Sequence, residues 1–93
     1  MIALDTNVLV RYLARDDVDQ FNIANELINS CTADQPGYVC REVMIELVWV
    51  LERSYKYSRE EIADALESIV SASQLEVESA QDIAAVLNLY RKE

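Results

Sequence analysis

The 93-residue chain contains no histidine, one glycine, one proline and two cysteines. Without histidine, the protein has no imidazole to act as a general base, as a zinc ligand or as the partner of a catalytic serine or cysteine. With so little glycine and proline and 52% hydrophobic residues, the composition excludes collagen-like and disordered chains. Any catalysis must therefore depend on carboxylates, hydroxyls, amides or a bound metal ion.

Basic residues are also few. Eight Lys and Arg against seventeen Asp and Glu give a formal net charge of -9 and an isoelectric point near 4.3. Such a surface repels a phosphodiester backbone unless a divalent cation or a local basic strip intervenes. The sequence therefore argues against passive binding of nucleic acid.

Long hydrophobic runs are absent. The densest, residues 43–51, is interrupted by Glu46 and is far shorter than the about 20 residues that span a bilayer. No positively charged residue followed by an apolar stretch opens the chain, as it would in a secretory signal. We therefore expect a soluble, cytoplasmic protein without membrane association, in which Cys31 and Cys40 are unpaired thiols.

Hydrophobic patterning predicts three short strands alternating with helices in one domain, residues 1–93. The strands are expected at residues 2–4, 38–40 and 75–78, and the helices at about residues 8–14, 18–28, 41–54, 59–70 and from 80 onward. Strands separated by helices indicate an α/β fold with a parallel sheet, in which ligands collect beyond the carboxyl ends of the strands. The core is expected to include Leu4, Val8, Leu47, Leu51, Leu66, Ile69 and Val77.

Polar residues mark where the helices begin. Thr6 or Asn7 is expected to cap the first helix. Ser58, followed three residues later by Glu61, predicts a capping box, and Ser79 opens a weaker one.

Two acidic residues stand out from their apolar neighbours. Asp5 ends an apolar strand, and Glu46 is the only charge in residues 43–51, without a cation three or four positions away. A buried carboxylate is costly unless it is protonated, paired or metal-bound. If the two acids converge at the carboxyl edge of the sheet, they suit Mg²⁺ or Mn²⁺. The alternatives are a capping role for Asp5 and an exposed or Arg-paired Glu46.

The residues around these acids resemble a known family. The segment IALDTNVLV at residues 2–10, followed by YVCREV at 38–43 and ELVWVL at 46–51, resembles a PIN domain. Within that family it is most similar to VapC-like toxins of type II toxin–antitoxin systems, which are Mg²⁺-dependent endoribonucleases. The resemblance spans nearly the whole chain and implies a three-layer PIN-like fold, with a short parallel sheet flanked by helices.

The resemblance also implies roles for single residues. Asp5 and Glu46 match the catalytic, metal-binding acids, and Thr6 and Asn7 match positions that shape the site by hydrogen bonding. The implied cofactor is Mg²⁺ or Mn²⁺, and the implied reaction is cleavage of RNA by metal-activated water.

The family continues with a segment of the type Asp-Phe-x-Asp, which supplies a third and often a fourth acid. This sequence stops at Glu93, before such a segment. We therefore expect an incomplete PIN-like domain without its C-terminal part, and little ribonuclease activity from these residues alone. Glu78 and Asp82 are the candidates for a third acid.

Partners and alternatives follow from the same comparison. The implied partners are an RNA substrate, a second copy in a homodimer, and an antitoxin whose basic segment we expect to bind the acidic crevice. Arg11, Arg15 and Arg41 are candidate substrate contacts, with a solvated helix face as the alternative. The alternative function is an inactive PIN-like remnant that binds an antitoxin or dimerises. A second enzyme class, phosphotransfer of the haloacid-dehalogenase kind, needs an Asp-x-Asp motif after the strand. This chain has Asn7 at the position of the second Asp, which argues against that class.

Overall fold

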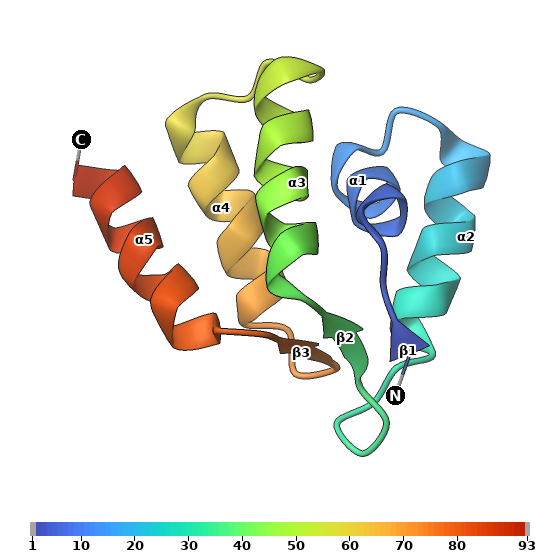
Figure 1. Ribbon diagram of the computed structural model, residues 1–93. Coiled ribbons are helices and arrows are strands. Elements are labelled where there is room, and N and C mark those ends of the chain that lie inside the picture. Colours follow the sequence, from blue (N-terminus) through green and yellow to red (C-terminus); the bar gives the residue numbers. More distant parts are fainter. Residues whose placement is uncertain (1, 93) are drawn as a thin grey trace.

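The described part of the chain forms three short strands and five helices (Figure 1). The computed structural model describes residues 2–92, without the side chains of Val86 and of residues 89–92. In chain order the elements are β1 (Ile2–Ala3), α1 (Thr6–Ala14), α2 (Val18–Asn29), β2 (Gly37–Val39), α3 (Arg41–Arg53), α4 (Arg59–Val70), β3 (Leu75–Val77) and α5 (Ala80–Lys92). The predicted order of strands and helices is confirmed.

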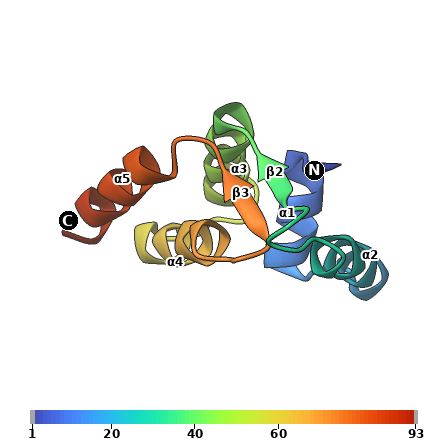
Figure 2. The same ribbon diagram turned by 90° about the horizontal axis from the view of Figure 1, so that it is seen from below.

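The strands form one parallel sheet in the order β1-β2-β3. Ala3 pairs with Tyr38, and Tyr38 pairs with Glu76, so all three strands run in register. Helices α3 and α4 lie beside the sheet, and α5 and α2 lie at opposite ends of the molecule (Figures 1 and 2). The α/β prediction, with a short parallel sheet flanked by helices, is therefore confirmed.

Helix α1 begins one residue earlier than its predicted caps allow. Asp5 is the N-cap: its backbone is extended and its side chain accepts a hydrogen bond from the Val8 N–H. Thr6 is already the first helical residue, and Asn7 follows it within the helix. The prediction that Thr6 or Asn7 caps this helix is wrong, because the chain leaves the sheet right after Leu4, whose N–H donates to the Tyr38 carbonyl.

The two predicted capping boxes have different outcomes. The Ser58 box is complete: the Glu61 N–H donates to Ser58 Oγ at 3.1 Å, and the Ser58 N–H donates to Glu61 Oε1 at 2.9 Å. Ser79 has a left-handed backbone with φ of 59°. A capping-box serine needs an extended backbone, so the second prediction is wrong.

A single core joins the sheet to the helices. Of the seven residues predicted for it, six are at most 9% exposed, and only Val8 is partly buried. Cys31 is buried, Cys40 is half-buried, and both are free thiols, as predicted. Across the described residues, each helix is too short or too polar to cross a lipid bilayer.

Candidate acidic site at the carboxyl edge of the sheet

Asp5 lies where β1 ends and α1 begins. Its Oδ1 accepts a hydrogen bond from the Val8 N–H at 3.0 Å, which satisfies one of the unpaired amides of the first helical turn. The side chain is exposed. The capping interpretation of Asp5 is thus confirmed, and the bond fixes where the carboxylate stands at the edge of the sheet.

The register of the sheet brings further residues to the level of Asp5. The Leu4 N–H donates to the Tyr38 carbonyl at 2.8 Å, and the Glu78 N–H donates to the Val39 carbonyl at 2.9 Å. Extended past the strand ends, this register aligns Asp5, Cys40 and Glu78: Cys40 and Glu78 directly follow their strands, and Asp5 lies two residues after β1. Because neighbouring strands are about 4.8 Å apart, these three residues line one short edge.

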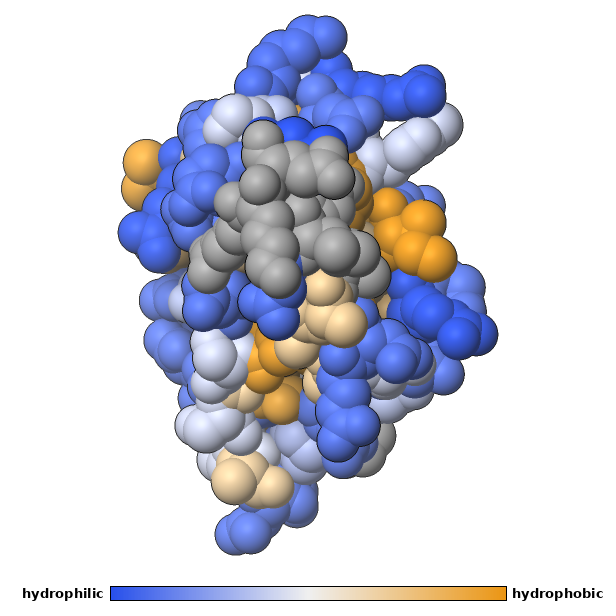
Figure 3. Space-filling view, turned by 90° about the vertical axis from the view of Figure 1, so that its left-hand side faces the viewer, coloured by the Kyte–Doolittle hydropathy of each residue, from blue (hydrophilic) through white to orange (hydrophobic). Residues whose placement is uncertain are grey.

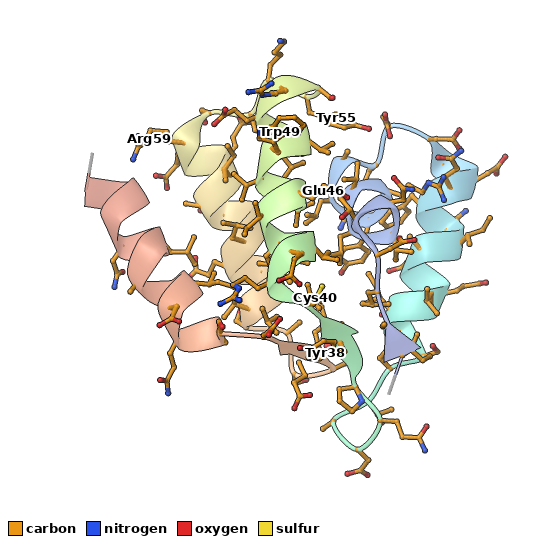
Figure 4. The ribbon with its side chains drawn as sticks, viewed as in Figure 1. Tyr38, Cys40, Glu46, Trp49, Tyr55 and Arg59 are labelled. Atoms are coloured by element: carbon orange, nitrogen blue, oxygen red, sulfur yellow. The ribbon has the colours of Figure 1, made fainter. Side chains whose placement is uncertain are left out.

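Glu46 lies on α3, the helix that follows β2. Helices α1 and α3 pack against each other, and Figure 4 shows Glu46 on the side of α3 toward α1. The side chain is exposed, although Met44 and Leu47 beside it in sequence are buried. The expectation that apolar neighbours bury Glu46 is therefore wrong: these neighbours occupy another face of the helix.

Thr6 and Asn7 occupy the first turn of α1, next to Asp5. Thr6 is 6% exposed and is the one buried polar residue among the described side chains, whereas Asn7 is exposed. Their supporting role stays a prediction.

Glu78 and Asp82 lie at the other end of the edge. Glu78 Oε1 accepts a hydrogen bond from the Arg41 N–H at 2.8 Å, so its carboxylate contacts the start of α3. Asp82, in the first turn of α5, lines a cavity together with Arg41 and Ser79. Within residues 2–92, the described side chains form no group of three or more acidic or thiol residues able to hold one metal ion.

Tyr38 belongs to this edge although the sequence indicated only a strand residue. Burial raises the pKa of the Tyr38 hydroxyl, and the charge of Glu78 and a hydrogen bond with it raise the pKa further. Figure 4 shows Tyr38 and Cys40 on adjoining parts of β2 and its end. The sequence gives no signal for this contact, because Tyr38 and Glu78 meet only when β2 and β3 pair.

The candidate arginines have different environments. Arg11 is exposed in the last turn of α1. Arg15 packs over the rings of Tyr12 and Phe21, with its guanidinium carbon 5.9 and 4.7 Å from the two centroids. Arg41 is exposed, and its Nε lies 3.9 Å from Glu42 Oε1. Contact with substrate stays a prediction for all three, and Arg15 has a packing role that the sequence did not indicate.

An apolar cavity of about 380 Å³ opens between α3, α4 and α5. Figure 3 looks onto this side of the molecule, where hydrophobic residues lie among hydrophilic ones. Ile45 and Trp49, which line the cavity, are 63% and 56% exposed. The remaining lining residues are Arg41, Met44, Val48, Leu66, Ser79, Asp82 and Ile83.

The fold is an α/β domain in which Asp5 and Glu78 lie beyond the carboxyl ends of two strands of a small parallel sheet. A family model described as PIN domain matches residues 2–93, and the chain belongs to the PIN-domain family. A curated relative, the VapC ribonuclease of Aquifex aeolicus (strain VF5), is 33% identical over 92 residues, which cover 99% of this chain and 68% of the relative. No solved structure gives a significant match. The resemblance deduced from the sequence is therefore confirmed.

Proposed function

We propose that the protein is a divalent-metal-dependent endoribonuclease of the VapC toxin type, with Asp5 and Glu46 as metal ligands. The observation that carries the proposal is the PIN-domain match over residues 2–93, read together with the position of Asp5 at the carboxyl edge. The position of Glu46 supports the proposal, because Glu46 lies on α3 and α3 packs against α1, the helix that Asp5 caps.

The donor chemistry fits Mg²⁺ or Mn²⁺. Both ions prefer carboxylate oxygens, and Mg²⁺ commonly uses one or two carboxylates while keeping several waters. Both carboxylates are exposed and thus accessible to a hydrated ion. Bound there, the ion would polarise water and neutralise charge that develops on the phosphodiester.

The chain's own residues would position the substrate. The Asp5 cap holds one carboxylate in place, and Thr6 and Asn7 would shape the site from the first turn of α1. Arg11 and Arg41 are exposed and can approach phosphate oxygens.

The formal charge of -9 opposes RNA binding without the cation and favours a basic antitoxin partner. A cytoplasmic location and a homodimer belong to the same proposal.

Isothermal titration with Mn²⁺ tests the ligands. Asp5→Asn preserves the helix cap, because Asn caps as well as Asp, and Glu46→Gln preserves volume. We expect each change to weaken Mn²⁺ binding by about tenfold or more, as loss of groups at metal sites commonly does.

Matched controls are available within the chain. Asp17 caps α2 in the same way, with Oδ1 accepting from the Gln20 N–H at 3.1 Å, and Glu52 is exposed on α3. Asp17→Asn and Glu52→Gln should leave Mn²⁺ affinity within about twofold of the wild type. Unchanged affinity in both site variants would show that these carboxylates are not ligands.

A second assay measures cleavage of a structured RNA with Mg²⁺ or Mn²⁺, with and without chelator. One observation favours a non-catalytic second candidate, a module that binds an antitoxin or dimerises: the described residues contain no group of three metal-binding side chains. Metal binding without cleavage would support this second candidate. Chelator-sensitive cleavage that Asp5→Asn abolishes would support the ribonuclease.

A further inference from the structure

Helix α3 begins without a cap from its own N-cap residue. Cys40 occupies that position with an extended backbone, but its side chain makes no capping hydrogen bond. The first N–H groups of a helix have no partner within the helix and need one elsewhere. The Arg41 N–H finds its partner 37 residues away, in Glu78 Oε1 at 2.8 Å.

Glu78 is itself held in place by the sheet. It directly follows β3, and its N–H donates to the Val39 carbonyl at 2.9 Å. Its backbone is thus bonded to the last residue of β2, while its side chain is bonded to the first residue of α3. A carboxylate at a helix N-terminus also interacts favourably with the helix dipole. One residue therefore connects both sides of the turn between β2 and α3.

From this geometry we infer that Glu78 is a positioning residue, which caps α3 from the neighbouring strand and so sets where α3 presents Glu46 relative to Asp5. The inference rests on the proposed function of Asp5 and Glu46. It assigns Glu78 a part different from that of a third metal ligand, because its Oε1 accepts the Arg41 N–H and so contacts the start of α3.

Glu46 is close enough to the cap to respond to it. It lies five residues beyond Arg41, about 7.5 Å along the helix axis. The strand end at Cys40 and the Glu78 bond both connect the first turn of α3 to the edge of the sheet. Because Asp5 stands on the other side of β2 at the same level, a shift of this turn changes the separation of the two acids.

Two substitutions separate reach from charge. Glu78→Gln keeps a side-chain oxygen at the same distance and removes the charge, whereas Glu78→Asp keeps the charge and shortens the side chain by one methylene. For a positioning residue, the Gln variant should bind Mn²⁺ within about twofold of the wild type, and the Asp variant should bind about fivefold more weakly. Glu76→Gln, on the exposed face of β3, is the matched control and should change nothing.

Hydrogen exchange gives a second readout that does not involve metal. The Arg41 amide and the amides of residues 42–46 should exchange about tenfold faster in Glu78→Asp, the size expected for a lost helix cap, and at nearly the wild-type rate in Glu78→Gln.

The opposite order of the two variants overturns the inference. If Glu78→Gln loses Mn²⁺ binding and Glu78→Asp retains it, Glu78 acts through its charge, as a ligand would. If Glu78→Asp speeds exchange but binds Mn²⁺ normally, the cap is structural only. If the wild type binds Mn²⁺ no better than Glu46→Gln, the proposed function fails. In that case the exchange rates at residues 42–46 still test whether Glu78 positions α3. If these rates are the same in Glu78→Asp and in the wild type, the positioning role is overturned as well.

Discussion

Gly37 provides a sharp test of how tightly the sheet is packed. It is the only glycine of the chain, it begins β2, and it is buried between the other two strands. A Cβ added there would lie 2.9 Å from Leu4 Cδ1, 3.0 Å from Cys31 Sγ and 3.0 Å from Leu75 Cδ2. These separations are shorter than ordinary van der Waals contacts, so Gly37→Ala forces its neighbours to move.

The cost of that movement can be bounded. The contacting atoms are the ends of side chains, but Leu4, Cys31 and Leu75 are each at most 9% exposed and have little room. Overpacking of this kind costs about 1–3 kcal/mol. Replacing glycine also stiffens the unfolded chain and returns about 0.4–1 kcal/mol. The two ranges combine to a net loss of about 0–2.6 kcal/mol, and we expect a value near its middle, about 1.3 kcal/mol in the free energy of unfolding.

Urea titration followed by circular dichroism measures this loss. For a domain of this size, 1 kcal/mol corresponds to a shift in melting temperature of about 4–8 °C. Cys31→Ala removes one of the three contacting atoms, so Gly37→Ala should cost at least about 0.5 kcal/mol less in that background. A Gly37→Ala protein as stable as the wild type, or an identical cost in both backgrounds, would refute the packing argument.

Three further changes test other parts of the fold. Leu51→Ala, at a fully buried position, should lower the free energy of unfolding by about 2–5 kcal/mol in a denaturant titration. Ser58→Ala should cost about 1 kcal/mol by the same measurement, because it removes the cap of α4. Burial and the hydrogen bond to Asp16, 3.2 Å from the Tyr55 hydroxyl, raise the pKa of Tyr55. Because the folded-state pKa is raised, the stabilisation from the Tyr55 hydroxyl is fully present below the unfolded pKa of about 10. It is lost as the pH rises through the folded-state pKa. Tyr55→Phe should therefore lower stability at neutral pH and lessen the loss at alkaline pH in thermal melts.

The sequence predicted best those features that depend on neighbours along the chain. The Ser58 box needs only Glu61 three residues later, and both of its hydrogen bonds are present. The first helix was harder, because Asp5, Thr6 and Asn7 can all cap. The choice among them depends on where Leu4 stops pairing with β2, and that is a contact between distant segments.

Glu46 shows why an apolar run is a poor measure of burial in a helix. Residues 43–51 contain one charge, yet Ile45 and Trp49 are also more than half exposed. Helix α3 packs against α1 and α4, and those contacts, not composition alone, determine which of its residues face inward. The Glu78 cap lay beyond sequence analysis altogether, because 37 residues separate donor and acceptor.

The exposure of both acids leads to a last prediction, on removal of metal. Buried carboxylates would destabilise the protein without a cation, but Asp5 and Glu46 are exposed, and Asp5 already stabilises α1 as its cap. We therefore expect the protein to stay folded in chelator, with Mn²⁺ at a hundredfold excess over its dissociation constant adding about 2.7 kcal/mol. Urea titrations with chelator and with Mn²⁺ measure this difference, and Asp5→Asn, with its affinity at least about tenfold lower, should gain about 1.4 kcal/mol or less at the same Mn²⁺ concentration. Unfolding by chelator alone would mean that the ion is part of the folded structure, and an equal gain in Asp5→Asn would place the ion elsewhere.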